Sequence, residues 1–527
     1  MHDATRTDEI SELRAENARL ASEREHYHRL YLATLEQCRK LELGLLGQKA
    51  ERLAEPEAQL TMALLAELLG RPAQPEPAPP PQTVKEHTRK KPTGRKPLPD
   101  HLPRVDLEVL PPEVERAGTD AFDRIGEDVS EVVEKRPASL VVVRVTRGKF
   151  VRKDRERLAE TEVLVADPLE LPIERGLAGP GLLADSVVRR WQDHLPLHRL
   201  ESIYAREGLA LARSTMCGWH ADLADLAKPL VAAMWQDGFT CPYLCTDATG
   251  VLVQAKDKCR GGHFWVVVAP ERHVLYAYSP KHDSAAVDRL LAGYRGHLVA
   301  DAHAVYDHLY KSGLVVEVGC WCHGRRYYWK ALESDPGRAR TALALIGELF
   351  RIERGIADSS LEERALVRQR DSRPVVDRFF AWCDAEAPLV LDDTPIAKAI
   401  GYAQNQRVAL SRFLDDARLP LHNNASELAL RRQVVGRRNW LFVGNDDAAE
   451  VNTTFVTLLA SARLHEIEPW AYLRDVFCLL PSWPSRRILE LAPACWKQTL
   501  EQEDTQQRLA ANVFRRASLG KLEHRDT

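Results

Sequence analysis

The sequence predicts an α/β protein whose core is a sheet with flanking helices, preceded by a long helix and interrupted by a large helical insertion. Three observations carry this prediction. Residues 8–54 repeat apolar side chains every seven residues, residues 243–321 alternate strand and helix patterns, and residues 330–418 keep helical spacing. Of the 527 residues, 28% are charged and 45% are apolar, which excludes a wholly disordered, collagen-like or fibrous chain.

Properties of the whole chain indicate its cellular setting. No stretch approaches the ~18 consecutive apolar residues of a membrane-spanning helix, and the first ten residues lack the apolar segment of a secretion signal. The 10 cysteines, with none between Cys38 and Cys217, are too sparse for a disulfide framework. We therefore expect a cytoplasmic protein that does not bind a membrane. The net charge of −3 says nothing about a nucleic-acid partner, so only local charge is informative.

Residues 8–54 form a predicted helix suited to a coiled coil. Asn17 stands in an apolar column, and a buried Asn there fixes register and favours two strands. We expect this helix to pair with a second copy of the chain; the alternative is a long solvated helix packed on its own chain. One column holds Leu13, Leu20, Tyr27, Thr34 and Leu41, and the other holds Ile10, Asn17, Arg24, Tyr31, Cys38 and Leu45.

Residues 71–104 form a predicted linker that is first rich in proline and then basic. Residues 85–104 carry seven Lys or Arg against Glu86 and Asp100, a balance of +5, and prolines keep the segment extended. Such a segment suits phosphates or a minor groove, and the alternative is a solvated, charged linker. The candidate DNA-binding residues are Arg89, Lys90, Lys91, Arg95 and Lys96.

Two small modules, one rich in strands and one helical, follow the linker as candidate DNA-binding parts. Residues 105–160 are β-rich and contain no cysteine, so they lack the thiolates of a zinc site. Residues 176–232 are helical and divide at Gly208, which fits a helix-turn-helix and equally a plain pair of antiparallel helices. In a helix-turn-helix, the residues facing a DNA backbone are Arg206, Arg213 and Ser214.

The alternating segment predicts a particular sheet. Strand patterns occupy 243–254, 263–269, 273–279, 297–300 and 314–321, and helix patterns occupy 283–294 and 302–312. The order β-β-β-α-β-α-β is that of the ribonuclease H-like arrangement, in which the first and fourth strands lie side by side. The ends of these two strands would bring Asp247 and Asp301 together.

Asp247 and Asp301 are the residue type that a pair of Mg²⁺ (or Mn²⁺) ions needs for phosphodiester chemistry. These cations prefer oxygen ligands, and two of them activate the attacking oxygen and stabilise the leaving one. A third carboxylate is required, and the candidate is Glu427, in the first turn of a helix that starts near Asn423 and Asn424. The alternative is a capping box from Asn424 to Glu427, without chemistry.

Several segments together resemble the insertion-sequence-66 family of bacterial transposases. The central segments are CTDATG (245–250), VADAHAVYDHLY (299–310), CWCHGRRYYW (320–329) and HNNASELALRRQVVGRRNWLFVG (422–444). The likeness continues in TGRKPLPDHLPR (93–104) and in SARLHEIEPWAYLRDVF (461–477), the latter within a predicted helical segment at 455–495. The Asn-Asn-x-x-Glu motif with its trailing arginines is specific to the family.

The resemblance implies a DDE transposase that cleaves DNA and transfers strands. It implies a ribonuclease H-like core at 240–330 and 419–445, interrupted by the helical insertion at 330–418. Asp247, Asp301 and Glu427 map onto the catalytic, metal-binding triad, with two Mg²⁺ or Mn²⁺ ions as cofactors. The implied partners are the terminal inverted repeats of the element, target DNA, further copies of the chain in a dimer or larger synaptic assembly, and accessory proteins of the same element. The expected location is the cytoplasm, at the nucleoid.

The chain departs from the family pattern in two places. Family members carry a cysteine-based zinc module after the basic linker, whereas residues 113–155 here contain no cysteine, so no zinc is expected. His422 stands where the family has Asp, which affects only local hydrogen bonding. The four cysteines nearest the predicted site are expected to be buried structural residues rather than zinc ligands; they are Cys241, Cys245, Cys320 and Cys322.

Arginines near the predicted site are candidate phosphate contacts. Two of them follow the fifth strand, where the alternative is a basic surface cluster, and four share a helix with Glu427. Trp440 and Phe442 are expected in the core rather than stacked on bases. The candidate residues are Arg325, Arg326, Arg431, Arg432, Arg437 and Arg438.

Two other functions are compatible with the sequence. A self-associating DNA-binding protein derived from a transposase would bind DNA without cutting it. A structure-selective nuclease with the same core would cut branched DNA without joining strands. Metal-dependent cleavage and strand joining separate the three possibilities.

Overall fold

The computed structural model describes residues 102–136, 139–153, 163–174, 176–256 and 258–520, together with residues 19, 20, 22, 24, 98 and 100. The predicted coiled coil and basic linker lie almost wholly outside these residues, and so do Arg89, Lys90, Lys91, Arg95 and Lys96. The chain divides into two compact units. The larger unit comprises Arg95–Cys320 and Arg418–Thr527, and the smaller comprises Met1–Gly94 and Trp321–Ala417.

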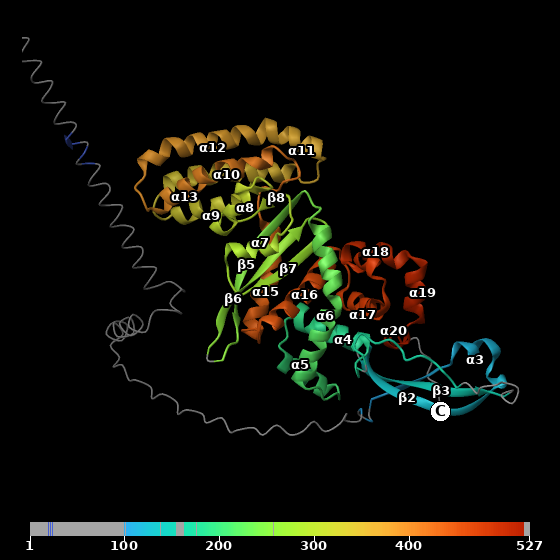
Figure 1. The fold of residues 1–527 in the computed structure, drawn as a ribbon. Coiled ribbons are helices and arrows are strands. Elements are labelled where there is room, and N and C mark those ends of the chain that lie inside the picture. Colours follow the sequence, from blue (N-terminus) through green and yellow to red (C-terminus); the bar gives the residue numbers. More distant parts are fainter. Residues whose placement is uncertain are drawn as a thin grey trace, which may run out of the picture. The chain divides into compact units, whose positions relative to one another are not determined.

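The centre of the larger unit is a five-stranded sheet in the order β7-β6-β5-β8-β9 (Figure 1). The first three strands pair antiparallel, whereas β8 and β9 run parallel to β5. The adjacency of the first and fourth strands, which the sequence predicts, is therefore confirmed. The strands are β5 (Tyr243–Val253), β6 (Arg260–Ala269), β7 (His273–Ser279), β8 (Gly296–Val299) and β9 (Val315–Val318).

The connections between these strands agree only in part with the sequence. Helix α7 (Ser284–Leu290) starts at the predicted cap, where the Asp283 side chain accepts a 2.9 Å hydrogen bond from the Ala286 main-chain N–H. The single helix predicted over 302–312 is wrong. The chain instead makes a 3₁₀ turn, η5 (Ala304–Tyr306), and a short helix, α8 (Asp307–Lys311).

The edge strand β7 is closed by the helix α16 (Asp446–Leu464). An edge strand presents main-chain N–H groups that have no strand partner on one side. Here the Ser461 hydroxyl accepts the Val274 N–H at 3.0 Å, and the Thr457 hydroxyl accepts the Tyr276 N–H at 2.9 Å. Two hydroxyl groups of a largely buried helix therefore accept hydrogen bonds from the main-chain N–H groups along the edge of the sheet.

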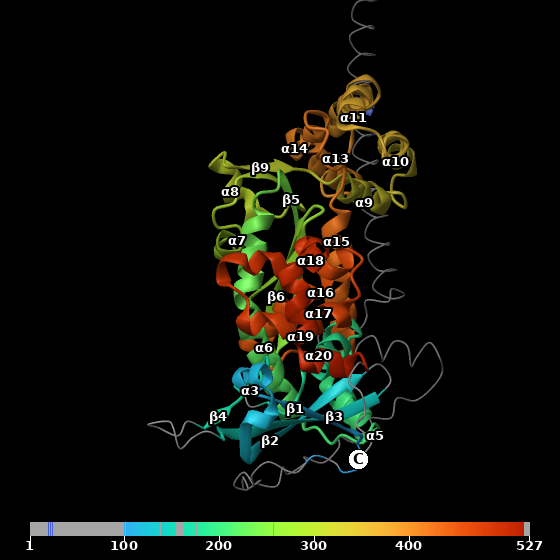
Figure 2. The ribbon, with the colours of Figure 1, turned by 90° about the vertical axis from the view of Figure 1, so that its right-hand side faces the viewer.

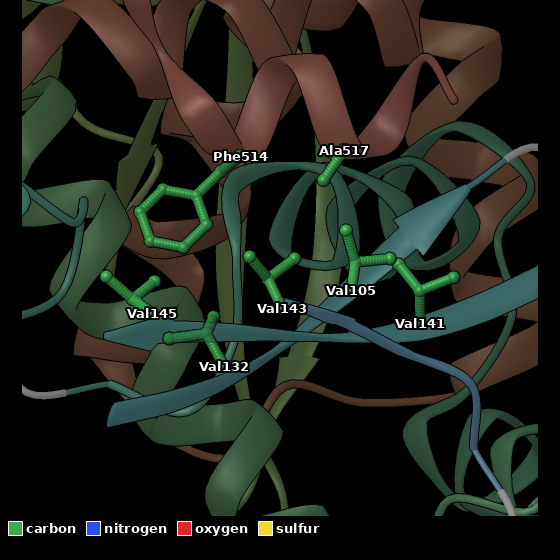
Figure 3. Close-up of a cluster of buried hydrophobic side chains, with 7 residues drawn as sticks. All are labelled: Val105, Val132, Val141, Val143, Val145, Phe514 and Ala517. Atoms are coloured by element: carbon green, nitrogen blue, oxygen red, sulfur yellow. The ribbon is translucent and has the colours of Figure 1, made fainter. Parts of the chain in front are cut away.

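A second sheet lies nearer the N-terminus of the larger unit. It has the order β1-β3-β2, with β4 paired to β3, and it contains the strands predicted within 105–160. Valines of this sheet pack against Phe514 and Ala517 of the C-terminal helix α20 (Val513–Ser518), as Figure 3 shows. The strands are β1 (Arg104–Val109), β2 (Phe122–Arg136), β3 (Ser139–Arg152) and β4 (Leu164–Val165).

Helices make up most of the rest of the larger unit (Figure 2). The helices predicted on either side of Gly208 are α5 (Leu197–Arg206) and α6 (Arg213–Gly238), and Gly208 has a φ of 89°. Helix α6 is buried along one side over most of its length. The others are α3 (Pro112–Ala117), η2 (Thr119–Ala121), α4 (Pro180–Val187), η4 (Val188–Gln192), α15 (Asn424–Trp440), α17 (Pro469–Leu479), η9 (Leu480–Ser482), η10 (Ser485–Leu491), α18 (Pro493–Glu501) and α19 (Glu503–Ala511).

All regular elements in the described part of the smaller unit are helices, joined by short turns. Arg368 is buried inside it, where its guanidinium pairs with both oxygens of Glu353 (2.8 and 2.7 Å) and donates to the Phe413 carbonyl at 2.7 Å. None of the helices in the described ranges is both long and apolar enough to cross a bilayer. The helices of this unit are α9 (Trp321–Ala331), α10 (Pro336–Gly355), α11 (Leu361–Val367), η6 (Arg368–Ser372), α12 (Arg373–Glu386), η7 (Ala387–Leu389), α13 (Pro395–Asn405), α14 (Arg407–Ser411) and η8 (Arg412–Leu414).

Candidate active site

Asp247 and Asp301 lie near the last pair of two neighbouring parallel strands. The register of β5 and β8 ends where Cys245 pairs with Val299; Asp247 follows two residues later within β5, and Asp301 follows two residues after β8 ends. Both side chains are half-buried. The strand register thus places the two predicted carboxylates at the same edge of the sheet, where β8 ends and β5 continues.

Tyr306 lies close enough to both aspartates to feel their charges. Burial and the charge of Asp301 raise the pKa of its phenol, a hydrogen bond with Thr246 lowers it, and the charge of Asp247 raises it further. The phenol therefore stays protonated at neutral pH. It can donate a hydrogen bond at this edge, but it cannot serve as a base. No residue pattern singles out Tyr306 beyond its place five positions after Asp301.

The helix that carries Glu427 is tied to β5 by Asn423. The side-chain amide of Asn423 donates a 2.8 Å hydrogen bond to the main-chain carbonyl of Thr246, the residue before Asp247. The main-chain N–H of Asn423 donates to the Cys320 sulfur at 3.2 Å. Asn423 is fully buried, and α15 begins at the next residue. Two contacts therefore fix where the first turn of α15, including Glu427, meets the sheet.

The capping-box alternative for Glu427 is wrong. The cap residue of α15 is Asn423, and its side chain makes no capping hydrogen bond because it is bonded to β5. A capping box needs the acidic residue three positions after the cap, and that position is Ser426. Glu427 is half-buried in the first turn and lies one residue beyond the capping position.

A divalent cation suits the type of donor at this edge. The two aspartates and Glu427 offer only oxygen ligands, and the buried Oδ1 of Asn423 has no hydrogen-bond partner among the described residues. No three His, Cys, Asp or Glu side chains within the described ranges are placed to hold a metal ion together. The described residues thus include oxygen ligands of the right type on neighbouring elements, but they do not bring three such side chains together around one position.

The four arginines of α15 divide into two kinds. Arg432 is half-buried, both of its terminal nitrogens donate to the Gln192 side-chain oxygen at 2.7 Å, and burial lowers the pKa of its guanidinium. Arg437 donates to the Thr249 hydroxyl at 2.9 Å and to the Gly250 carbonyl. Both side chains are thus engaged by the protein.

Arg431 and Arg438 are the exposed pair. Because a helix turns 100° per residue, they lie within about 40° of Glu427 around the axis of α15. The three side chains form one stripe, so the exposed arginines continue along the helix from the candidate site.

The two arginines predicted after the fifth strand lie in the smaller unit, on α9. Arg325 and Arg326 are both exposed there, and the guanidinium of Arg325 lies 5.6 Å from the ring centre of Trp329. Trp329 is itself among the most exposed large apolar side chains of the described residues. The helix therefore presents a basic and aromatic face.

The prediction that Trp440, the last residue of α15, and Phe442, just after it, both belong to the core is half wrong. Trp440 is buried, whereas Phe442 is 41% exposed. The reason lies in Leu441, whose φ of 64° reverses the chain direction between the two aromatic side chains. A positive φ at leucine is not visible in the residue pattern, since leucine rarely adopts it.

The structure also has a cluster of histidines beside Asp301 that the sequence did not predict. The His282 ring stacks on Trp265 with ring centres 4.8 Å apart, and it lies 5.1 Å from His263 and 4.7 Å from His303. Burial, followed by the charges of His303 and His263, lowers the pKa of His282, while the charge of Asp301 raises it. These residues come from three separate segments, so no spacing along the chain connects them.

The cysteines near the site are predominantly buried thiols. Cys241, Cys245 and Cys320 are buried, and Cys322 is half-buried. Burial raises the pKa of the Cys245 thiol to about 12, so it remains uncharged at neutral pH.

Comparison with known proteins matches most of the chain to one family. Residues 175–451 match the description "Transposase IS66 family", residues 35–107 match "Transposase C of IS166 homeodomain", and residues 457–494 match "IS66 C-terminal element". The first match contains both aspartates, Glu427 and the four arginines of α15.

Similar curated proteins come from Sinorhizobium fredii (strain NBRC 101917 / NGR234). The uncharacterized protein y4hP is 31% identical over 492 residues, which cover 87% of this chain and 88% of that protein. The uncharacterized protein y4qI is 30% identical over 426 residues, covering 77% of this chain and 78% of that protein. The resemblance stated from the sequence is confirmed: the chain belongs to the IS66 family of transposases.

Proposed function

We propose that the protein is a DDE transposase that cleaves the ends of its element and joins them to target DNA at one metal-dependent site. The observation that supports this proposal is the pairing of β5 with β8, since Asp247 and Asp301 each follow the last pair, Cys245 and Val299, by two residues, and the start of α15 is bonded to β5. The strand order β7-β6-β5-β8-β9 supports a ribonuclease H-like core. In that core, helical residues 321–417 are the insertion between β9 and α15.

The proposed catalytic roles rest on residue type and on the elements that carry the three side chains. Asp247, Asp301 and Glu427 would hold two divalent ions through carboxylate oxygens. Bound Mg²⁺ or Mn²⁺ would supply Lewis-acid polarisation of the phosphate and neutralise charge on the leaving oxygen. Asn423 ties the start of the helix that carries Glu427 to the strand that carries Asp247. Arg431 and Arg438 bind phosphates along α15, because they are exposed on the same face as Glu427.

The remaining predicted contacts complete the assembly. Arg325 and Arg326 on α9, and the basic residues at 89–96, bind DNA backbone outside the carboxylate site. The helix at 8–54 joins two or more copies of the chain, so that both ends of the element are held in one complex, with or without accessory proteins. The protein acts on DNA in the cytoplasm, at the nucleoid.

The test uses the full chain with a duplex that carries the inverted repeats flanking its coding region, in Mg²⁺. The wild-type protein should release a 3′-hydroxyl at the element end and join it to a second duplex. Asp247→Asn, Asp301→Asn and Glu427→Gln should each lower cleavage by at least a thousandfold and leave DNA binding within about threefold. Asp307→Asn is the matched control, since Asp307 is an exposed carboxylate only six residues beyond Asp301.

Each alternative function predicts a different result. Binding without cleavage by the wild-type chain would identify a non-catalytic DNA-binding protein. Cleavage of branched DNA without strand joining would identify a nuclease. Full cleavage by a folded Glu427→Gln protein would remove Glu427 from the triad.

A further inference from the structure

The chain makes a strained turn immediately after α15. Leu441 has φ 64° and ψ −48°, and the Phe442 N–H donates a 2.8 Å hydrogen bond to the Trp440 carbonyl two residues back. This is a γ-turn of the form with positive φ, which is rare and strained in L-residues. A branched side chain pays the full steric penalty there, whereas glycine would not. Such strain persists only where the surroundings enforce it, and it gathers at functional sites.

The surroundings of this turn do enforce it. Trp440 and Val443, on either side of the exposed pair, are both buried in one apolar cluster with Val253 and Phe264. Val443 is further bonded to β5, because its N–H donates to the Leu252 carbonyl at 2.9 Å and its carbonyl accepts the Gln254 N–H at 2.8 Å. The turn is thus held by a buried anchor at each end.

Two apolar side chains point outward between these anchors. Leu441 is 63% exposed and Phe442 is 41% exposed, and Leu252 on the adjoining part of β5 is 45% exposed. We call Leu441 and Phe442 the apolar tip. A pair of large apolar side chains fixed in water by a strained backbone has no folding advantage, so it indicates contact with a partner.

The charge around the apolar tip favours a polyanion as that partner. The exposed residues Arg431 and Arg438 lead toward the tip along α15, and Lys256 and Lys258 are exposed on the turn that follows β5. Of the acidic residues that follow the tip, Asp446 is paired with Arg260 and hydrogen-bonded by Tyr278, and Asp447 is exposed at the start of α16. Apolar side chains flanked by basic residues are the arrangement found in proteins that insert side chains between base pairs.

We propose that the apolar tip is a wedge that enters the bound DNA duplex and unstacks one base step. The proposal rests on the function proposed above, since it takes DNA to lie along α15. The tip is about 20 Å along the helix axis from Glu427, because each helical residue adds 1.5 Å. At 3.4 Å per base pair, the unstacked step lies about six base pairs from the phosphate that is cut.

The wedge is tested by fluorescence of 2-aminopurine, which brightens when its neighbours no longer stack on it. Duplexes of the element end carry one 2-aminopurine at each position from two to ten base pairs from the cut site, with Ca²⁺ in place of Mg²⁺. We expect a rise of at least threefold at five to seven base pairs with the wild-type chain. Leu441→Ser with Phe442→Ser should abolish this rise. Leu314→Ser, which changes a leucine that is 50% exposed just before β9, should not.

A second variant keeps the test valid if the double substitution disturbs folding. Leu441→Gly removes the strain together with the side chain, so its melting temperature should equal or exceed that of the wild type while the fluorescence rise falls. A duplex with an abasic site six base pairs from the cut should restore cleavage by the double variant to within about threefold of wild type, because the step is already unstacked.

Three results would overturn the wedge. The first is an equal fluorescence rise with the wild type and the double variant, and the second is no rise at any position. The third is a double variant that loses oligomer mass but keeps the wild-type fluorescence rise, which would make the tip a contact between copies. A chain that unstacks the step but never cuts any duplex would contradict the proposed transposase activity and leave the wedge standing.

Discussion

The side-chain amide of Asn423 is hydrogen-bonded to the main-chain carbonyl of Thr246 at 2.8 Å. One end of this bond is the residue before Asp247, and the other is the cap residue of the helix that carries Glu427. The bond is fully buried, so water cannot replace it. It therefore acts as a positioning contact between two of the three proposed catalytic carboxylates.

Replacing Asn423 should damage the site more than the fold. Asn423→Leu leaves the Thr246 carbonyl unpaired and should cost about 1–3 kcal/mol of unfolding free energy. Cleavage should fall by at least a hundredfold, whereas DNA binding should be retained. Asn424→Ala, one residue later and half-buried, is the control and should change cleavage by less than about threefold. Circular dichroism melts and cleavage rates measure the two effects, and normal cleavage by Asn423→Leu would contradict the positioning role.

The arginines of α15 should separate DNA binding from stability. Arg431→Ala with Arg438→Ala should reduce the slope of log affinity against log salt by about two, since each lost phosphate contact removes about 0.9. Arg432→Ala should leave that slope unchanged and lower stability by about 1 kcal/mol, because it breaks the contact with Gln192. Filter binding at several salt concentrations and thermal melts distinguish them. The opposite assignment of effects would show that the exposed pair does not bind DNA.

Acid should destabilise the larger unit through His220. Burial lowers the pKa of this residue to about 3, and its ring lies against Trp191 and Phe455. In the unfolded chain this histidine binds a proton near pH 6.5, whereas in the folded chain it stays neutral until a much lower pH. The free energy of unfolding therefore falls as the pH drops below 6.5. From pH 7 to pH 5 the loss should be about 2 kcal/mol. His220→Leu should remove this loss and His198→Leu, at an exposed position, should not; urea unfolding at both pH values measures it.

Self-association should depend on the predicted coiled coil. Leu13→Asp with Leu20→Asp places charges in one apolar column of residues 8–54, and the variant should behave as a monomer in light scattering. Arg19→Asp, at a position on the outer side of the predicted helix and in neither apolar column, is the control and should keep the mass of the wild type. An unchanged mass in the double variant would mean that this helix does not join copies of the chain.

Local patterns predicted the strands of the central sheet because strand propensity depends on residues that are adjacent in the sequence. The runs HFWVVVA and HVLYAYS became β6 and β7, and the cap at Asp283 opens α7 as expected. Strand order followed from the alternation of elements, since parallel neighbours need a helical connection between them. The adjacency of β5 and β8, near whose last pair Asp247 and Asp301 lie, then required no further information.

Contacts between distant segments were not visible in the sequence. The Asn423 bond spans 177 residues, and the packing of Phe514 against the small sheet joins the two ends of the described chain. The exposure of Phe442 depends on one backbone angle, at Leu441, that its residue type disfavours. Residue type and spacing report local preference, whereas these three features arise from tertiary packing that overrides it.

The contact of the Asn423 N–H with the Cys320 sulfur also brings together the two ends of the segment that lies between them in the sequence. Cys320 is the last residue of the larger unit before the helical residues 321–417, and Asn423 follows soon after the chain returns. The chain therefore leaves the larger unit and returns to it close to one contact, as the ends of a closed loop do. Doubling the length of a loop costs only about 0.6 kcal/mol of chain entropy, so segments of very different size are tolerated between fixed ends. A change in the length of residues 321–417 should therefore leave the contact between Asn423 and Cys320 in place.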